Sequence, residues 1–155
     1  MSTTDFSLSS FTRYAREAGF LGQNLQSIRS VKKFSGGQSN FTYLIDTGER
    51  QLVLRKQPNG ILLSNSAHQV DREALIMTGM RREGRGAVPL PEIYAIESDT
   101  SIIGTKFFLM EFAPGVIYRD PRLPGLTPTL REVVYRDMAR VLARIHTVDY
   151  RNVVP

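Results

Sequence analysis

Cysteine and tryptophan are absent from this sequence, and its 155 residues include only four lysines and two histidines. The lack of cysteine excludes disulfides, thiolate zinc sites and cysteine nucleophiles. The two histidines, His68 and His146, are too far apart in the chain to form a histidine metal motif. We interpret both as structural residues, since His146 lies at a predicted helix end, where a cation is favoured.

Long apolar runs and targeting segments are also absent. The longest apolar run covers a few residues around 107–110, far short of the roughly 20 residues that a membrane span needs. The N-terminal segment MSTTDFSLSS has neither the basic region nor the apolar core of a signal peptide. The sequence therefore predicts a cytoplasmic protein that does not contact a membrane.

The composition that remains is that of an ordinary globular domain, with 41% hydrophobic and 23% charged residues. The net charge of +5 comes largely from arginine, which suits phosphate, carboxylate or nucleic acid. No basic stretch is interleaved with aromatic residues, and the densest basic run, residues 81–85, ends a predicted helix. We therefore interpret the basic residues as part of a solvated surface and expect no nucleic-acid partner.

Hydrophobic periodicity and turn signals predict an α+β fold. A short helix is expected within residues 5–18, and strand-like runs occur at 27–34, in FTYLID, and at 51–56, 92–96 and 106–112. The first three runs form an antiparallel meander. We expect a five-stranded antiparallel sheet with its helices grouped on one side.

Two further helices are predicted after the meander. Ser66 is a candidate N-cap for a helix that runs to about Arg82. Its expected inner side consists of Val70, Ala74, Leu75, Met77 and Met80. Thr127 and Pro128 begin the last helix, over residues 127–147. Its wide apolar face has little remaining chain to bury it, so we expect it to pair with a missing part or to self-associate. That face consists of Leu130, Val133, Val134, Met138, Val141, Leu142 and Ile145.

The segment at residues 35–40, SGGQSN, joins two predicted strands and is a candidate anion site. Gly36 and Gly37 let the backbone approach an anion closely, and the side chains of Ser39 and Asn40 can donate to phosphate oxygens. Two glycines at a hairpin are usually just a turn, which is the alternative interpretation. The segment matches neither the P-loop nor the dinucleotide-binding pattern.

A second candidate is Arg55, a cation on an otherwise apolar strand. By strand alternation it shares a face with Val53, while Leu52 and Leu54 point the other way. A guanidinium there needs a partner, because an unpaired buried charge is costly. Glu73 on the following helix could pair with it and hold it toward the glycine segment, although two unrelated surface charges are the alternative. Lys56 competes for the role but lies on the opposite face.

Five segments in this order resemble the aminoglycoside-phosphotransferase-like (choline/aminoglycoside kinase-like) family: FSGGQSNFTYLI, LVLRKQPNG, VDREALIMTGM, FFLMEFAPG and LARIHTVDY. They look most like the branch associated with acyl-CoA dehydrogenases, over about residues 20 to 151. The resemblance implies a protein-kinase-like amino-terminal lobe. It divides the chain into an N-terminal helical extension (1–26), a kinase-like nucleotide-binding lobe (27–113), a linker (114–126) and the first helix of a truncated carboxy-terminal lobe (127–155).

The resemblance also implies that ATP binds to particular residues. Arg55 matches the strand position usually held by lysine, which pairs with the α- and β-phosphates and with a helix glutamate, here Glu73. The phosphate-covering loop would consist of Gly36, Gly37, Gln38, Ser39 and Asn40. The adenine would be held by Val53, Met110, Glu111, Phe112 and Ala113, with the Glu111 carbonyl and the Ala113 N–H forming the hydrogen bonds.

The carboxylates that perform phosphoryl transfer in this family do not occur in the chain. They belong to a His-Gly-Asp loop with a following Asn and to a later metal-binding Asp, and the chain ends at Pro155 before any of them. We therefore assign no catalytic or metal-binding residue, and the Mg²⁺ ligands are expected beyond residue 155.

The sequence thus predicts the nucleotide-binding lobe of an ATP-dependent phosphotransferase, inactive as this fragment. Its partner would be a small-molecule hydroxyl substrate bound by the missing lobe, and a hydroxyacyl-CoA is favoured over an aminoglycoside by analogy. The alternative is a non-catalytic nucleotide-binding or interaction module that uses the same lobe.

Overall fold

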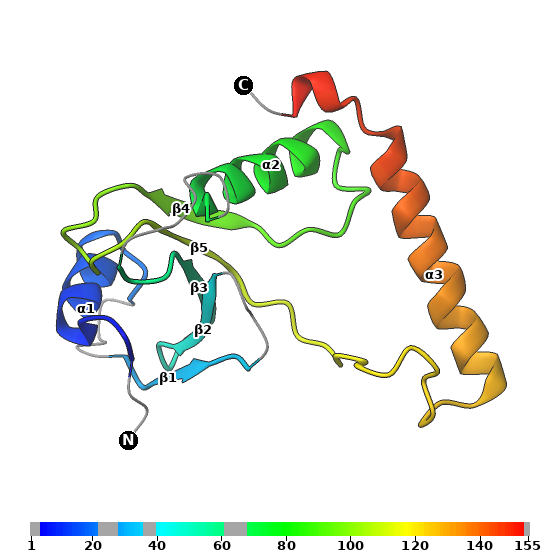
Figure 1. The fold of residues 1–155 in the computed structure, drawn as a ribbon, viewed down its shortest axis with the longest axis horizontal. Helices are drawn as coiled ribbons and strands as arrows, with labels where there is room; N and C mark the ends of the chain where they lie inside the picture. The colour runs from blue at the N-terminus through cyan, green and yellow to red at the C-terminus, as the bar shows by residue number, and fades with distance from the viewer. Residues whose placement is uncertain (1–3, 22–27, 36–39, 61–67, 154–155) are drawn as a thin grey trace. The chain divides into compact units, whose positions relative to one another are not determined.

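The computed structural model describes residues 4–21, 28–35, 40–60 and 68–153. Figure 1 shows its helices and strands along the chain. Their bounds are α1 Leu8–Glu17, β1 Ser30–Lys33, β2 Phe41–Asp46, β3 Gln51–Lys56, α2 Val70–Glu83, β4 Ile93–Glu97, β5 Phe107–Glu111, α3 Pro128–Thr147 and the 3₁₀ helix η1 Tyr150–Asn152. The predicted α+β class is confirmed.

The strands form one antiparallel sheet in the order β1-β2-β3-β5-β4. The predicted meander β1-β2-β3 is confirmed, and Gly48, with φ of +90°, lies in the turn between its second and third strands. The central strand β3 pairs with β2 on one side and with β5 on the other. Arg55 lies opposite Thr42 on β2 and opposite Phe108 on β5.

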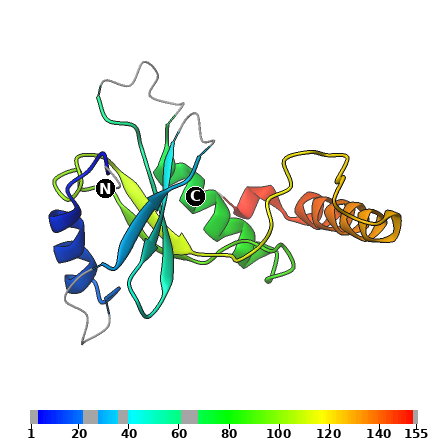
Figure 2. The same cartoon turned by 90° about the horizontal axis from the view of Figure 1, so that it is seen from below.

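Helices cover both faces of this sheet, so the prediction that they group on one side is wrong (Figure 2). The reason lies in β3, where Leu52, Val53 and Leu54 are all buried, so that both faces of the strand require cover. One face packs against α1 in a core that includes Phe11, Ala15, Tyr43, Ile45, Leu52, Leu54, Phe107 and Leu109. The other packs against the start of α2 through Val70, Ala74 and Phe108.

The first helix belongs to the core of the sheet. Ser7 caps its N-terminus by accepting a hydrogen bond from the Ser10 N–H, and Phe11 and Ala15 are buried. The hydroxyl of Tyr14 donates to Glu97 of β4 at 2.7 Å. The N-terminal segment is therefore tied to the opposite edge of the sheet from β1.

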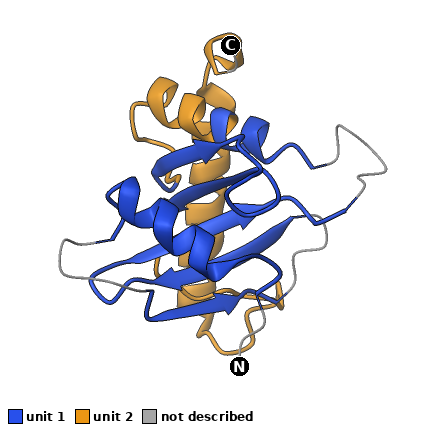
Figure 3. Ribbon diagram, turned by 90° about the vertical axis from the view of Figure 1, so that its left-hand side faces the viewer, with its two compact units in different colours: residues 1–75, 91–112 blue, residues 76–90, 113–155 orange. Residues whose placement is uncertain are grey.

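The chain divides into two compact units (Figure 3). Unit 1 comprises residues 1–75 and 91–112, and unit 2 comprises residues 76–90 and 113–155. The division falls within α2, which begins at Val70, while the expected cap Ser66 lies outside the described residues. Leu75, expected on the inner side of this helix, is 41% exposed, whereas Val70 and Ala74 are fully buried.

Unit 2 contains the second half of α2, α3 and η1. Gly79 lies against the backbone of Val153, where a Cβ atom would come within 2.0 Å of the Val153 carbonyl oxygen. The Arg82 guanidinium donates to the Asn152 carbonyl at 2.7 Å. Within this unit a glycine and an arginine therefore join the end of α2 to η1.

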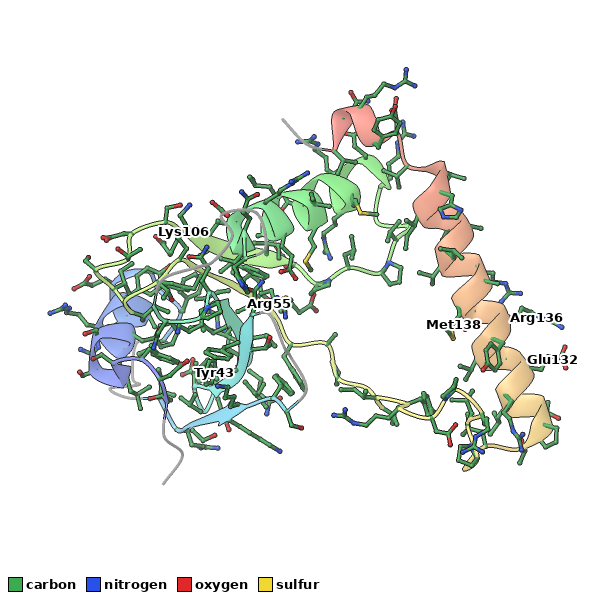
Figure 4. All side chains as sticks on the ribbon, viewed as in Figure 1. Tyr43, Arg55, Lys106, Glu132, Arg136 and Met138 are labelled. Atoms are coloured by element: carbon green, nitrogen blue, oxygen red, sulfur yellow. The ribbon has the colours of Figure 1, made fainter. Side chains whose placement is uncertain are left out.

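The last helix, α3, has the predicted cap, with the Thr127 side chain accepting from the Leu130 N–H and Pro128 in its first turn. None of its residues is buried, and Met138 and Leu142 are 59% and 52% exposed. The described residues of unit 2 thus leave the apolar face uncovered, as expected. Figure 4 labels Met138 on this helix. It also labels Glu132 and Arg136, and these two residues form the predicted ion pair. Among the described helices, none combines the length and apolar character that crossing a membrane requires.

Candidate functional site

The centre of the candidate site is an ion pair between β3 and α2. The Arg55 Nε lies 2.9 Å from the Glu73 carboxylate, and Arg55 Nη1 donates to Thr42 Oγ1 on β2 at 3.0 Å. The pairing predicted between Arg55 and Glu73 is therefore present in the structure. Thr42 was not predicted, although it lies directly opposite Arg55 in the antiparallel register.

Arg55 retains hydrogen-bonding capacity after these contacts. A guanidinium has five N–H donors, and Glu73 and Thr42 are the acceptors found for it among the described residues. The Arg55 and Glu73 side chains are 27% and 35% exposed, so the pair is neither sealed in the core nor freely solvated. A positioned cation with unused donors at a sheet surface is suited to bind an anionic oxygen.

An apolar surface adjoins this cation on the same face of the sheet. Val53 is two residues from Arg55, is 6% exposed, and lies opposite Met110 of β5. Met110 is half-buried and packs against the cluster of Val70, Ala74 and Phe108. The structure therefore places Val53 and Met110, two of the five residues predicted to contact adenine, side by side.

The other residues predicted to contact adenine lie at the end of β5. Glu111 is exposed, its N–H donates to the Glu92 carbonyl at 2.8 Å, and its carboxylate accepts from the Glu92 N–H at 3.1 Å. Phe112 is half-buried and ends the described part of unit 1, while Ala113 is exposed and belongs to unit 2. Their hydrogen bonds to adenine stay a prediction.

Most of the predicted phosphate-covering loop lies outside the described residues, namely Gly36, Gly37, Gln38 and Ser39. Its last member, Asn40, is 6% exposed, and its Oδ1 lies 3.4 Å from Nδ1 of His68. His68 precedes α2, and its carbonyl accepts from the Gln57 side chain at 2.7 Å. The histidine thus connects the end of the glycine segment to the start of α2.

Lys56, the competing cation, belongs to a different environment. It lies on the α1 face with 0% exposure, and its Nζ is 2.8 Å from Asn59 Oδ1 and 3.5 Å from Asp5 Oδ1. Burial lowers the pKa of its amine, and the Asp5 carboxylate opposes that shift. Tyr43 also donates to Asp5, and burial raises the pKa of the Tyr43 hydroxyl. The structure thus separates the two adjacent cations onto opposite faces, as strand alternation predicted.

A second ion pair holds α2 to the sheet and was not predicted. Lys106, just before β5, lies 2.8 Å from the Asp71 carboxylate in the first turn of α2. The hydrogen bond from Lys106 holds the pKa of the Asp71 carboxyl below its ordinary value. The sequence offered a weak signal for this pair, since a lone lysine adjoins an apolar strand in the same way that Arg55 does.

Within the described residues, no group of three His, Cys, Asp or Glu side chains could hold a metal ion. We assign no metal ligand in the described part of the chain.

Comparison with known proteins identifies the family. The profile of the phosphotransferase enzyme family matches residues 30–155, so the chain belongs to that family. It is 50% identical over 131 residues to acyl-CoA dehydrogenase family member 10 from Mus musculus, a match that covers 84% of this chain and 12% of the mouse protein. The seven acyl-CoA dehydrogenase relatives share this pattern, and the chain spans only 12% to 18% of their lengths.

Solved structures agree with this assignment. A protein from Ralstonia eutropha JMP134, described as an aminoglycoside phosphotransferase, superposes with a TM-score of 0.73 and 31% identity, covering 96% of this chain and 40% of its own. Aminoglycoside phosphotransferase APH(4)-Ia, in a ternary complex with AMP-PNP and hygromycin B, shares the fold with a TM-score of 0.55 and 22% identity. That match covers 85% of this chain and 39% of the neighbour. The predicted resemblance is therefore confirmed, and the chain corresponds to less than half of these structures.

Proposed function

We propose that this chain provides the nucleotide-binding lobe of an ATP-dependent phosphotransferase that acts on a small-molecule hydroxyl. The observation that carries the proposal is Arg55, which Glu73 and Thr42 hold on the sheet face beside Val53 and Met110. A cation with free donors next to apolar side chains suits a ligand that joins phosphates to an aromatic base. The complex of APH(4)-Ia with AMP-PNP supports the same ligand class in a protein of this fold.

In this proposal each part of the lobe has a defined task. Arg55 would donate to the α- and β-phosphate oxygens, and Glu73 would keep the guanidinium oriented in both the free and the bound states. Val53 and Met110 would pack against adenine. The bound ATP would supply the γ-phosphoryl group. The residues of this chain would bind and orient it, and no step is assigned to a metal ligand here.

The acceptor that we propose is a hydroxylated small molecule carried as a CoA thioester. The support is indirect, because proteins named acyl-CoA dehydrogenases contain a segment similar to this chain at up to 50% identity. The chain itself contains no His-x-Asp-x-x-x-x-Asn motif. We therefore expect the 155-residue protein to bind nucleotide without transferring phosphate.

Nucleotide binding can be tested by titrating ADP into the protein and into Arg55→Ala. Charge-assisted hydrogen bonds contribute about 1.5–3 kcal/mol each, so Arg55→Ala should weaken ADP binding by about tenfold or more. Arg72→Ala is the matched control, because Arg72 is exposed on α2 one residue from Glu73 and its loss changes the net charge equally. Absence of ADP binding by the wild-type protein, or equal weakening in both variants, would contradict the proposal.

A further inference from the structure

We propose that Asp71 and Lys106 are positioning residues for the nucleotide site: their ion pair fixes the rotation of α2 so that Glu73 reaches Arg55. This inference rests on the proposed function for its binding readout. The contacts that carry it all lie within unit 1, and Figure 4 labels the two cations, Arg55 and Lys106, on the sheet.

The apolar contact between α2 and the sheet is too narrow to fix the helix by itself. It is centred on Val70 and Ala74, which are one turn apart and pack with Phe108 at 0% exposure. At 100° per residue these two positions span only about 40° of the helix surface. A helix that packs firmly on a core usually presents an apolar stripe of about 100° or more. The apolar contact that opposes rotation of α2 about its own axis is therefore small.

The two acidic residues of the first turn lie on either side of this narrow stripe. Measured from its centre, Asp71 leaves the helix at about +80° and Glu73 at about −80°. The Asp71 carboxylate lies 2.8 Å from Lys106 Nζ, and the Glu73 carboxylate lies 2.9 Å from Arg55 Nε. Any rotation that shortened one ion pair would lengthen the other. The two pairs together therefore define one rotational position.

The two cations are fixed relative to each other by the sheet. Arg55 is on β3 opposite Phe108 of β5, and Lys106 lies two residues before Phe108 on the same face. The Gln57 N–H donates to the Lys106 carbonyl at 3.1 Å, which continues the pairing of these two strands. The Gln57 side chain also donates to the carbonyl of His68 at 2.7 Å, and this contact resists sliding of α2 along its axis. The cations thus form a rigid reference for the helix.

The lowered pKa of the Asp71 carboxyl agrees with this role, since the first cause is the hydrogen bond from Lys106. The Asp71 Oδ1 also accepts a hydrogen bond from the Arg72 backbone N–H at 3.1 Å. The side chains of Lys106 and Asp71 are 38% and 29% exposed. Their pair is accessible enough to be replaced without opening the core.

The test compares two substitutions with opposite electrostatic effects on an anionic ligand. Asp71→Asn makes the lobe more positive and Lys106→Met makes it less positive, yet loss of position should weaken binding of ADP in both. We expect about fivefold to tenfold weaker binding for each variant. The charge-swapped protein, Asp71→Lys with Lys106→Asp, should recover most of the affinity. Lys32→Met, an exposed lysine of β1, is the matched control and should bind nearly as wild type.

Tighter ADP binding by Asp71→Asn would overturn the inference, because it would show only the electrostatic effect of removing a negative charge. Unchanged binding would overturn it too, because the pair would then not affect the nucleotide site. Failure of the charge swap to recover affinity would overturn it as well. If the wild-type protein binds no ADP, the proposed function fails. The positioning role of the Asp71–Lys106 pair is then tested by a second measurement, of stability. In urea denaturation, the loss of stability caused by Glu73→Gln should then fall to about half in the Asp71→Asn background. Additive losses would overturn the inference.

Discussion

Replacing Lys56 with methionine should reduce the stability of the fold while leaving nucleotide binding largely intact. The Lys56 amine is fully buried, donates to Asn59 at 2.8 Å and lies 3.5 Å from Asp5. Losing a hydrogen bond to a charged donor costs about 1.5–3 kcal/mol. Methionine fills a similar volume and removes the cost of burying the amine, which offsets roughly 1 kcal/mol.

The stranded Asp5 carboxylate adds to the cost of this substitution, but only in part. Breaking a fully buried ion pair costs about 3–5 kcal/mol, whereas the Asp5 side chain is 26% exposed and still accepts from Tyr43. We therefore expect a net loss of about 2 kcal/mol, which corresponds to a shift of about 1 M in the urea midpoint. Lys32→Met, at an exposed lysine, should change stability by less than about 0.5 kcal/mol.

Urea denaturation followed by circular dichroism measures this difference directly. The double variant Asp5→Asn with Lys56→Met should regain part of the lost stability, because it removes the stranded charge. A Lys56→Met protein with the midpoint of the wild type would refute the assignment of Lys56 to the core. Loss of nucleotide binding in a Lys56→Met protein that remains folded would refute the assignment of nucleotide binding to Arg55 and of a structural role to Lys56.

Three further predictions concern single contacts. Helix propensity favours alanine over Gly79 by about 1 kcal/mol, but its Cβ would lie 2.0 Å from the Val153 carbonyl oxygen. Gly79→Ala should therefore reduce the free energy of unfolding by about 1–3 kcal/mol and lower the melting temperature. A higher melting temperature would disprove the packing of η1 on α2. The depressed pKa of Asp71 means that its pair stabilises the fold above the unfolded pKa of about 3.9 and that this contribution is lost as the pH falls through the lower folded pKa. Lys106→Met should accordingly flatten the acid limb of a stability–pH curve, and an identical limb would argue against the pair. Thr127→Ala removes the N-cap of α3 and should reduce helix stability by about 1 kcal/mol, which calorimetry of matched samples can check.

The central features of the sheet follow from local patterns and could be predicted. Alternation along QLVLRK places Arg55 and Lys56 on opposite faces, and a charge on an apolar strand requires a partner. From these arguments Glu73 is one candidate partner for Arg55, with two unrelated surface charges as the alternative. The family resemblance favours the pair, which the structure contains. The cap at Thr127 with Pro128 also depends on neighbouring residues only.

Other features depend on tertiary contacts that a sequence pattern does not encode. The run of buried residues at Leu52, Val53 and Leu54 signals a strand covered on both faces, but it does not say which helix covers which face. The Asp71–Lys106 pair joins residues 35 positions apart, and it requires the rotation of α2 and the start of β5 to be known together. Gly79 resembles an ordinary helix-weakening residue until Val153 is placed against it.

The most direct test of the proposed site compares how ADP and adenosine bind to the wild-type protein and to Arg55→Ala. If Arg55 contacts the phosphates, its removal should weaken ADP binding by about tenfold or more, as expected for a charge-assisted hydrogen bond. Adenosine, which lacks phosphates and would use only the surface of Val53 and Met110, should bind both proteins with nearly equal affinity. Equal weakening of both ligands, or no preference of the wild-type protein for ADP over adenosine, would contradict the placement of the phosphates at Arg55.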